Sequence, residues 1–180
     1  MSPQASQLSK DKVMVGFEEE ARVIALWDME YDEEDCEYNA PEGFEYLGEG
    51  ASRVAYRSLA SGFVYKRHYY PDDDTNEFEY MNILRIKDIP LKGWRVPDAT
   101  LYHIEGEQII AMEFIEGGMD IHCQRSYKFW NKDCDCGKPF GVCTADAWEQ
   151  PEGKWHVEDL HIGNIILQED GCRVLIDLGA

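Results

Sequence analysis

Apolar and polar residues alternate with a period of two along most of residues 44–115, a pattern typical of half-buried β-strands. Five segments follow it, with the sequences FEYLG, VAYRSL, FVYKRHY, ATLYHIE and QIIAMEFI. Between the third and the fourth, residues 74–87 carry the signals of a helix, with Asp74 or Thr75 as the N-cap. Acidic residues in its first turn and basic residues in its last turn suit the helix dipole. The pattern therefore predicts three strands, one helix and two further strands.

The flanking segments have other patterns. Residues 17–31 repeat apolar side chains at helical spacing, which predicts a helix with one apolar face made of Phe17, Ala21, Ile24, Trp27 and Tyr31. The acidic run of residues 32–43 predicts a solvated linker that ends in a Pro and Gly break. Residues 121–130 and 144–150 are interpreted as short helices on either side of a loop.

The segment NIILQEDGCRVLID (residues 164–177) predicts a β-hairpin closed by a two-residue turn at Asp170-Gly171. In that register Leu167 faces Val174 and Asn164 faces Asp177, with Asp159 on the preceding loop. One carboxamide and two carboxylates would then converge, a donor set that suits Mg²⁺ and the handling of an attacking hydroxyl. The alternative is a polar hairpin mouth with ordinary turn chemistry.

Three features of residues 44–115 bear on this choice. Gly48 and Gly50 lie in a hairpin loop that would approach a phosphate closely. Lys66 lies within a strand and shares its face with the apolar Val64, while Phe63 and Tyr65 lie on the other face. The helix that follows carries Glu77 and Glu79, either of which would reach Lys66. Each feature alone has an ordinary explanation, as a turn, a solvent-facing lysine or an exposed acid.

In chain order these motifs resemble those of the protein-kinase-like superfamily, across residues 44–180. The string DLHIGN is similar to the catalytic loop of the aminoglycoside-phosphotransferase branch and of atypical small kinases from phages or bacteria. The string GEGASRVAY is similar to small atypical kinases with Arg53 in place of the third loop glycine. The resemblance implies an α+β, protein-kinase-like fold, with a five-stranded antiparallel N-lobe plus one helix and a minimal, truncated C-lobe. The implied segments are an N-terminal helix and acidic linker (1–43), an ATP-binding N-lobe (44–117) and a C-lobe with catalytic loop and metal-binding hairpin (118–180).

The resemblance also implies site residues for ATP. Gly48 and Gly50 would cover the phosphates, and Lys66 would hold the α- and β-phosphates while pairing with Glu79 or, alternatively, Glu77. The adenine would be held by the residues that line the site and the hinge, namely Ala55, Val64, the gatekeeper Met112, and the backbone of Glu113 and Ile115.

For catalysis the resemblance implies Asp159 as the base and His161 as a contact to the γ-phosphate. Asn164 and Asp177 would be the Mg²⁺ ligands. The largest departure from the family pattern is at the end of the chain, where a single residue follows Gly179. We therefore expect the usual platform for a protein substrate to be absent.

The cysteines raise a separate question. Cys134, Cys136 and Cys143, with Cys123 or His122, would supply four ligands to Zn²⁺. The spacing is unlike common zinc patterns, and reduced loop thiols are the default alternative. With six cysteines and no apolar leader or membrane-length segment, we expect a cytoplasmic protein, in the host cytoplasm if phage-encoded.

The charge is strongly acidic, with 17 Lys and Arg against 36 Asp and Glu, a net charge of −19. Such a surface repels nucleic-acid phosphates, so direct nucleic-acid binding is not expected. Three hypotheses follow. In the first, the protein is an ATP- and Mg²⁺-dependent Ser/Thr kinase acting on a host protein. In the second, it is an acidic pseudokinase-like module that binds a basic or nucleic-acid-binding host protein without catalysis. In the third, the acidic surface mimics nucleic acid and sequesters a DNA- or RNA-binding protein.

Overall fold

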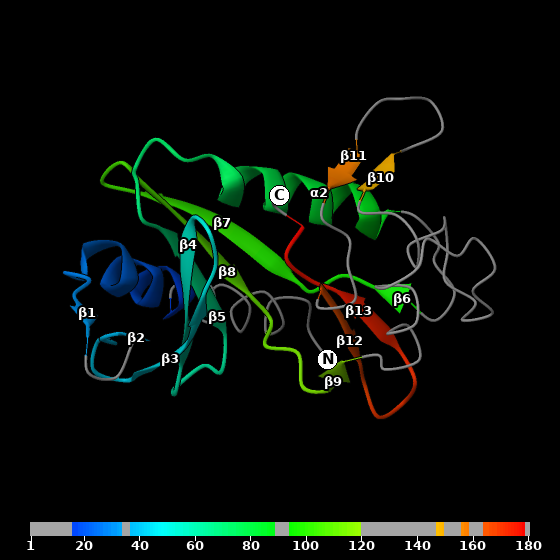
Figure 1. Cartoon of the computed structure of the whole chain (residues 1–180), viewed down its shortest axis with the longest axis horizontal. Helices are drawn as coiled ribbons and strands as arrows, with labels where there is room; N and C mark the ends of the chain where they lie inside the picture. Colours follow the sequence, from blue (N-terminus) through cyan, green and yellow to red (C-terminus); the bar gives the residue numbers. More distant parts are fainter. Residues whose placement is uncertain are drawn as a thin grey trace, which may run out of the picture. The chain divides into compact units, whose positions relative to one another are not determined.

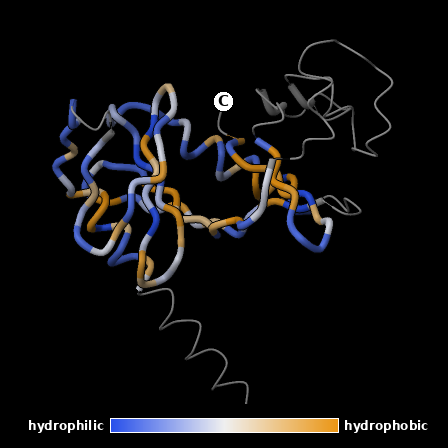
Figure 2. Tube along the Cα trace, turned by 60° about the horizontal axis from the view of Figure 1, so that its bottom comes forward, coloured by the Kyte–Doolittle hydropathy of each residue, from blue (hydrophilic) through white to orange (hydrophobic). Residues whose placement is uncertain are grey.

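The structure is a computed structural model that describes residues 16–33, 37–88, 94–119, 147–149, 156–158 and 164–178. The chain divides into two compact units, Met1–Asn76 with Ala99–Phe114 and Glu77–Asp98 with Ile115–Ala180. Among the described helices, none has the length and apolar character needed to cross a membrane. In Figure 2 hydrophobic segments alternate with hydrophilic ones along the described chain.

The first unit is built on a five-stranded antiparallel sheet with strand order β3-β4-β5-β8-β7 (Figure 1). Its strands are Phe44–Glu49 (β3), Arg53–Ser58 (β4), Val64–His68 (β5), Ala99–Ile104 (β7) and Glu107–Met112 (β8). Glu105 and Gly106 join β7 to β8, and both are left-handed, with φ of 52° and 94°. This is the two-residue turn that best matches strand twist. The predicted α+β class and the five antiparallel strands with one helix between the third and fourth are confirmed.

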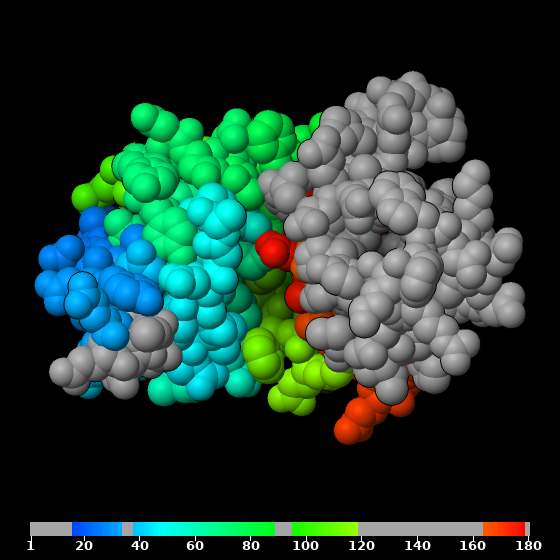
Figure 3. Space-filling model, in the orientation of Figure 1, coloured from blue at the N-terminus to red at the C-terminus, as the bar shows by residue number. Residues whose placement is uncertain are grey.

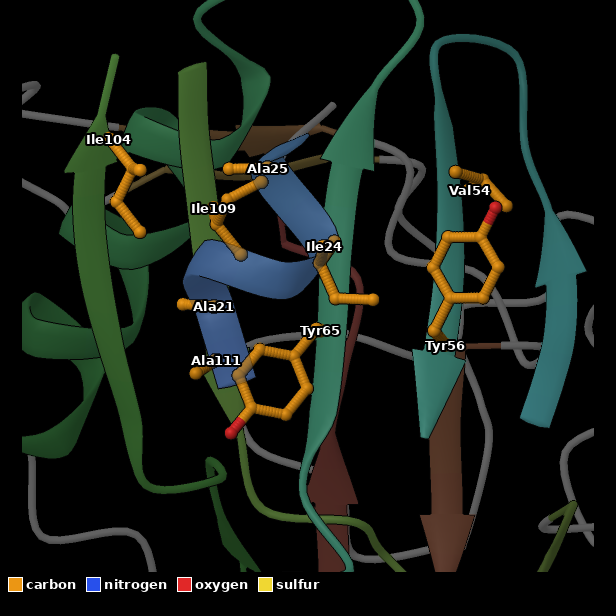
Figure 4. Close-up of a cluster of buried hydrophobic side chains, with 9 residues drawn as sticks. All are labelled: Ala21, Ile24, Ala25, Val54, Tyr56, Tyr65, Ile104, Ile109 and Ala111. Atoms are coloured by element: carbon orange, nitrogen blue, oxygen red, sulfur yellow. The ribbon is translucent and has the colours of Figure 1, made fainter. Parts of the chain in front are cut away.

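One face of this sheet is covered by the N-terminal helix, described over residues 16–26 (Figure 4). Ala21, Ile24 and Ala25 pack against a buried cluster on the strands made of Val54, Tyr56, Tyr65, Ile104, Ile109 and Ala111. Burying a side chain such as Ile24 completely contributes about 1.5–3 kcal/mol. Nη1 of Arg67 in β5 donates hydrogen bonds to the carbonyls of Ile24 and Trp27. These bonds tie the C-terminal end of the helix, where carbonyls lose helical partners, to the sheet.

The helix is shorter than the sequence predicted. It ends at residue 26, so Trp27 and Tyr31 do not continue its apolar face. Tyr31 instead lies in β1 (Tyr31–Asp32), which pairs with β2 (Glu37–Tyr38) inside the segment expected to be a solvated linker. The rings of Tyr31 and Tyr38 are 5.2 Å apart in an edge-on arrangement. Cross-strand aromatic contact of this kind stabilises a short ribbon that the acidic composition does not predict.

The second unit contains most of helix α2 (Thr75–Lys87) and a four-stranded sheet of order β6-β13-β12-β9. The strands are Trp94–Arg95 (β6), Gly118–Met119 (β9), Ile165–Leu167 (β12) and Arg173–Leu175 (β13). Asn82 of α2 donates a 2.8 Å hydrogen bond from Nδ2 to the carbonyl of Leu178. This bond connects the helix to the segment that follows β13.

The short helix predicted over residues 144–150 is wrong for the central part of that segment. Ala147–Glu149 forms strand β10, which pairs antiparallel with His156–Glu158 (β11). Trp148 and Val157 lie opposite each other in this pair. Both residue types favour strands, and pairing outweighs the weak helical signal of so short a segment.

Candidate functional site

The glycine-rich hairpin joins β3 to β4 in the first unit. A β-bulge between Tyr46 and Gly48 interrupts the regular pairing, and Gly48 has a φ of 148°. A Cβ atom added at Gly48 or Gly50 would meet no atom of the described chain within 4 Å. The N–H of Gly50 donates to the carbonyl of Arg53 at 2.8 Å, which closes the turn. The loop therefore offers an open backbone surface of the kind that a phosphate can approach closely.

Gly48, Ala55, Lys66 and Ile110 form one row across four neighbouring strands. The pairings are Gly48 with Ala55, Ala55 with Lys66, and Lys66 with Ile110. Residues directly opposite each other in an antiparallel pair point to the same face. The row therefore carries the Lys66 side chain on the same face as the glycine-rich hairpin.

The two faces of the sheet have different roles. Tyr56, Tyr65 and Ala111 alternate with this row and belong to the core beneath the N-terminal helix (Figure 4). Val64 and Met112, opposite each other in β5 and β8, share the Lys66 face and are 7% and 4% exposed. The expectation that Lys66 shares its face with Val64, opposite to Tyr65, is confirmed. Lys66 itself is half-buried between apolar neighbours.

Of the two acidic candidates on α2, Glu77 is exposed and Glu79 is fully buried. A carboxylate is rarely buried completely unless it has a charged or hydrogen-bonding partner. This difference favours Glu79 over Glu77 as a functional or structural acid.

The segment expected to be the hinge follows β8. Met112 is the last residue of that strand, and residues 113–117 leave the sheet. Glu113 is half-buried and Ile115 is 8% exposed. The guanidinium of Arg57 lies 3.9 Å from the centre of the Phe114 ring, a cation–π contact that holds this segment against β4.

A buried polar cluster at the start of α2 was not predicted from the sequence. His68 at the end of β5 is 2% exposed, and its Nε2 accepts a 3.0 Å hydrogen bond from the N–H of Asn76. Burial lowers the pKa of His68, although Asp73, at 3.5 Å, acts in the opposite direction. The imidazole is therefore a neutral acceptor that caps one of the first N–H groups of the helix.

Asp73 belongs to the same cluster. Burial acts to raise its pKa, but hydrogen bonds from the side chain and backbone of Thr75, with the charge that His68 carries when it is protonated and the charge of Arg53, lower the pKa below its usual value. The Thr75 N–H donates to Asp73 Oδ1 at 2.8 Å. The capping carboxylate is thus Asp73, one residue before Asp74 and two before Thr75, the two predicted candidates. Arg53, 9% exposed, donates from Nη1 to Asn76 Oδ1 at 3.1 Å and so also belongs to this cluster.

The β12–β13 hairpin in the second unit has a register one residue away from the predicted one. Leu167 lies opposite Arg173 and Ile165 opposite Leu175. The N–H of Gly171 donates to Gln168 at 3.0 Å, and that of Gln168 to Cys172 at 2.9 Å, so the loop has three residues. Its last residue, Gly171, is left-handed with a φ of 82°.

The physical reason lies in Asp170. A two-residue turn of the predicted kind needs a positive φ at both central residues, whereas of Asp170 and Gly171 only Gly171 has one. Asp170 Oδ1 instead accepts a 2.8 Å hydrogen bond from the N–H of Cys172, an Asx-type bond available without a left-handed backbone.

The corrected register changes the surroundings of the metal-ligand candidates. Asn164, 6% exposed, lies opposite Ile176, whose N–H donates to the Asn164 carbonyl at 2.9 Å. Asp177 follows in a left-handed conformation with a φ of 55°. For a residue other than glycine this conformation is uncommon, and it ends the regular alternation of the strand. The predicted direct pairing of Asn164 with Asp177 is therefore wrong, although both residues lie at the open end of the hairpin.

Several predicted site residues lie outside the described residues. They are the catalytic candidates Asp159 and His161 and the zinc candidates His122, Cys123, Cys134, Cys136 and Cys143. Within the described ranges, no group of three or more His, Cys, Asp or Glu side chains is arranged to hold a metal ion. The proposed roles of all these residues stay predictions.

No family model and no curated protein matches the chain. Among solved structures, one similar chain is that of the GDP and kanamycin complex of APH(2″)-IIia, with a TM-score of 0.32 and 15% sequence identity. The match covers 45% of this chain and 27% of that chain.

Proposed function

We propose that this protein is an ATP- and Mg²⁺-dependent phosphotransferase. The observation that carries the proposal is the row Gly48–Ala55–Lys66–Ile110, which combines an open glycine-rich hairpin and a half-buried lysine on one sheet face. A lysine with a purely structural role does not need a glycine-rich hairpin beside it. A bound nucleotide needs both groups, because its phosphates require close approach of the backbone and a fixed positive charge.

The proposal assigns a group to each part of the nucleotide. Gly48 and Gly50 cover the phosphates, and the Lys66 ammonium neutralises charge on the α- and β-phosphates. The adenine packs against the apolar side chains on the same face, Ala55, Val64 and Met112, and hydrogen-bonds to the backbone of Glu113 and Ile115. Glu79 orients Lys66. Its complete burial supports this choice over Glu77.

Within the second unit Asn164 and Asp177 are the proposed metal ligands. Their amide and carboxylate oxygens are the hard donors that Mg²⁺ prefers. The Ile176–Asn164 hydrogen bond and the left-handed backbone of Asp177 hold both residues in defined conformations, which supports a ligand role. When bound, Mg²⁺ neutralises charge on the β- and γ-phosphates. The order of the motifs along the chain is the reason for assigning these metal ligands and the nucleotide-binding residues to one site.

The remaining residues have roles in the transfer step. The carboxylate of Asp159 accepts the proton of an acceptor hydroxyl while the hydroxyl oxygen forms a bond to the γ-phosphorus. The bond from that phosphorus to the bridging oxygen breaks, which releases ADP. His161 contacts the γ-phosphate. We favour a serine or threonine hydroxyl of a host protein as acceptor, with the enzyme encoded by a phage or bacterium, over a small molecule such as an antibiotic.

A second candidate function rests on the net charge of −19. An acidic module with a kinase-like nucleotide site could bind a basic or nucleic-acid-binding host protein and inhibit it without catalysis. Zn²⁺ at the cysteine-rich loop is compatible with either function, and both place the protein in the host cytoplasm.

Labelling with γ-³²P-ATP and Mg²⁺ separates the two functions. The protein is incubated alone and with bacterial lysate, beside an Asp159→Asn variant, while ATP binding is measured by calorimetry. A kinase gives labelled bands with the wild type that disappear with the variant, and both proteins bind ATP. Binding without mutant-sensitive label supports the non-catalytic module. Absence of ATP binding would refute the nucleotide site itself.

A further inference from the structure

Helix α2 has an unusual distribution of side chains, because its outer face is apolar. Phe78, Met81 and Leu84 are 55%, 38% and 40% exposed. They recur every three residues and therefore form one continuous stripe along the helix (α2 is green in Figure 3). The opposite face buries the apolar Ile83 and Ile86 together with the polar Asn76, Glu79 and Asn82. A helix of a monomeric domain normally keeps its large apolar side chains on the buried face, so a second, exposed apolar stripe is unusual.

The residues of the stripe are arranged symmetrically about Met81 along the sequence. Phe78 and Leu84 stand three residues before and after Met81, and Glu77 and Arg85 stand four residues before and after it. Both charged residues are exposed, and at this spacing they lie on the same face of the helix as Met81. The stripe thus has an acidic residue at its N-terminal end and a basic residue at its C-terminal end.

We propose that this stripe is the contact surface of a two-fold symmetric dimer, in which α2 packs antiparallel against α2 of a second copy. With the two-fold axis at Met81, the two Met81 side chains meet, and each Phe78 packs against the other copy's Leu84. Each Glu77 then faces the other copy's Arg85. This self-complementarity is what an isologous interface requires.

The charge pattern favours a second copy over a different partner. A uniformly basic partner helix would be attracted at Glu77 but repelled at Arg85 and at the exposed Lys87 nearby. A uniformly acidic partner would meet the opposite conflict. An antiparallel copy of α2 satisfies both ends at once.

The expected dimer is weak. Three large apolar side chains per copy are fewer than those of a standard interface, which buries about 800 Å² per partner. The net charge of −19 on each copy also opposes association at long range. The dimer should therefore form reversibly and depend on protein concentration. This inference does not depend on the proposed phosphotransferase function.

Sedimentation velocity of the full chain over a concentration series, at one fixed salt concentration, tests the proposal. The wild type should shift from monomer toward dimer as concentration rises. Met81→Glu places two like charges at the axis and should raise the dissociation constant by about tenfold or more. The matched control is Leu59→Glu, which changes another exposed leucine, 66% exposed in the β4–β5 loop, and should leave the dissociation constant unchanged.

Charge exchange gives a test specific to the two-fold arrangement. Glu77→Arg and Arg85→Glu should each weaken the dimer, because each creates two like-charged pairs. An equimolar mixture of these two variants should recover it, since every Arg then faces a Glu, and so should the double variant. Circular dichroism confirms that each variant is folded. A wild type that stays monomeric at every concentration, a Met81→Glu dimer as strong as the wild type, or a folded mixture that fails to associate would overturn the proposal.

Discussion

Asn76 at the start of α2 holds the backbone of Lys66, because its Nδ2 donates a 3.0 Å hydrogen bond to the Lys66 carbonyl. The same nitrogen donates to the Gln108 carbonyl at 2.8 Å, and Asn76 Oδ1 accepts from Arg53 at 3.1 Å. The N–H of Asn76 donates to His68 at 3.0 Å. One fully buried residue is thereby bonded to β4, β5 and β8. The position of the lysine row on the sheet therefore depends on a residue with no proposed role in chemistry.

Replacing Asn76 with alanine should destabilise the protein by about 2–4 kcal/mol, since it leaves a buried guanidinium and two partly buried carbonyls with fewer partners. Chemical denaturation measures the loss. The control is Asp72→Ala, which removes an exposed polar side chain before the same helix and should change stability by less than about 0.5 kcal/mol. Equal stability of the two variants would contradict the role assigned to Asn76.

The neutral His68 should make stability depend on pH. Burial lowers its pKa from the ordinary value of 6.5, while Asp73, Glu107 and Asp74 act to raise it and Arg53 to lower it. The unfolded chain therefore binds the proton more readily than the folded chain. The contribution of His68 is complete above pH 6.5 and is lost as pH falls from 6.5 through the folded pKa. The Asp73 contribution is lost only at lower pH, below its ordinary 3.8.

His68→Gln keeps a possible acceptor for Asn76 but removes the titration. The free energy of unfolding, measured between pH 7.5 and 5, should fall more steeply for the wild type than for this variant. His103→Gln, at an exposed position in β7, should retain the wild-type slope. Wild-type dependence in both variants would show that another group is responsible.

Local sequence signals predict the strands and the helix. They do not predict which side chains of these elements contact one another. Period-two alternation was sufficient to find β3, β4, β5, β7 and β8, because each has one face buried under the N-terminal helix. The Asp170-Gly171 pair is compatible with both a two-residue and a three-residue loop, and only the backbone shows that Asp170 is not left-handed. Asn76 has the appearance of an ordinary residue in the first turn of a helix. Its importance comes from three strands that the sequence does not place beside it.

The N-terminal helix should be an integral part of the first unit because of Glu20. Its carboxylate accepts hydrogen bonds from Ser58 Oγ at 2.8 Å, Ser61 Oγ at 2.6 Å and the hydroxyl of Tyr65. Burial and the bond to Glu20 raise the pKa of Tyr65 well above its usual range, so its hydroxyl stays a donor. Glu20→Ala should cost about 2–4 kcal/mol, because buried hydroxyls lose a charged acceptor.

Limited proteolysis and chemical denaturation together check this expectation. The neighbouring Glu19→Ala removes an exposed acid from the same helix and should have little effect on either measurement. If Glu20→Ala is cut no faster than Glu19→Ala, the carboxylate does not anchor the helix.

Gly117 and Gly118 should respond differently to the same substitution. A Cβ at Gly117 would lie 2.5 Å from the carbonyl oxygen of Leu167 and 2.6 Å from Cγ2 of Ile166, and Gly117 has a φ of 157°. Gly118 lies opposite Leu167 in the β9–β12 pair, yet a Cβ there meets no described atom within 4 Å. Gly117→Ala should therefore cost about 1–3 kcal/mol or more, and Gly118→Ala far less, as measured by thermal unfolding. Similar melting temperatures would mean that the β9–β12 contact is looser than the structure shows.

Lys66→Met should remove ATP binding without unfolding the protein. If Lys66 neutralises the phosphates, saturating Mg²⁺ and ATP should stabilise the wild type by RT ln(1 + [L]/Kd), about 2.7 kcal/mol at a ligand concentration of about 100 Kd. For a chain of this size that corresponds to a rise in Tm of several degrees, at about 2–4 °C per kcal/mol. The variant should show little or no rise. Lys87→Met is the matched control, because Lys87 is exposed and pairs with Asp98 rather than lying in the row with Gly48. An ATP-dependent shift that persists in Lys66→Met, or disappears in both variants, would contradict the assignment of Lys66 to the phosphates.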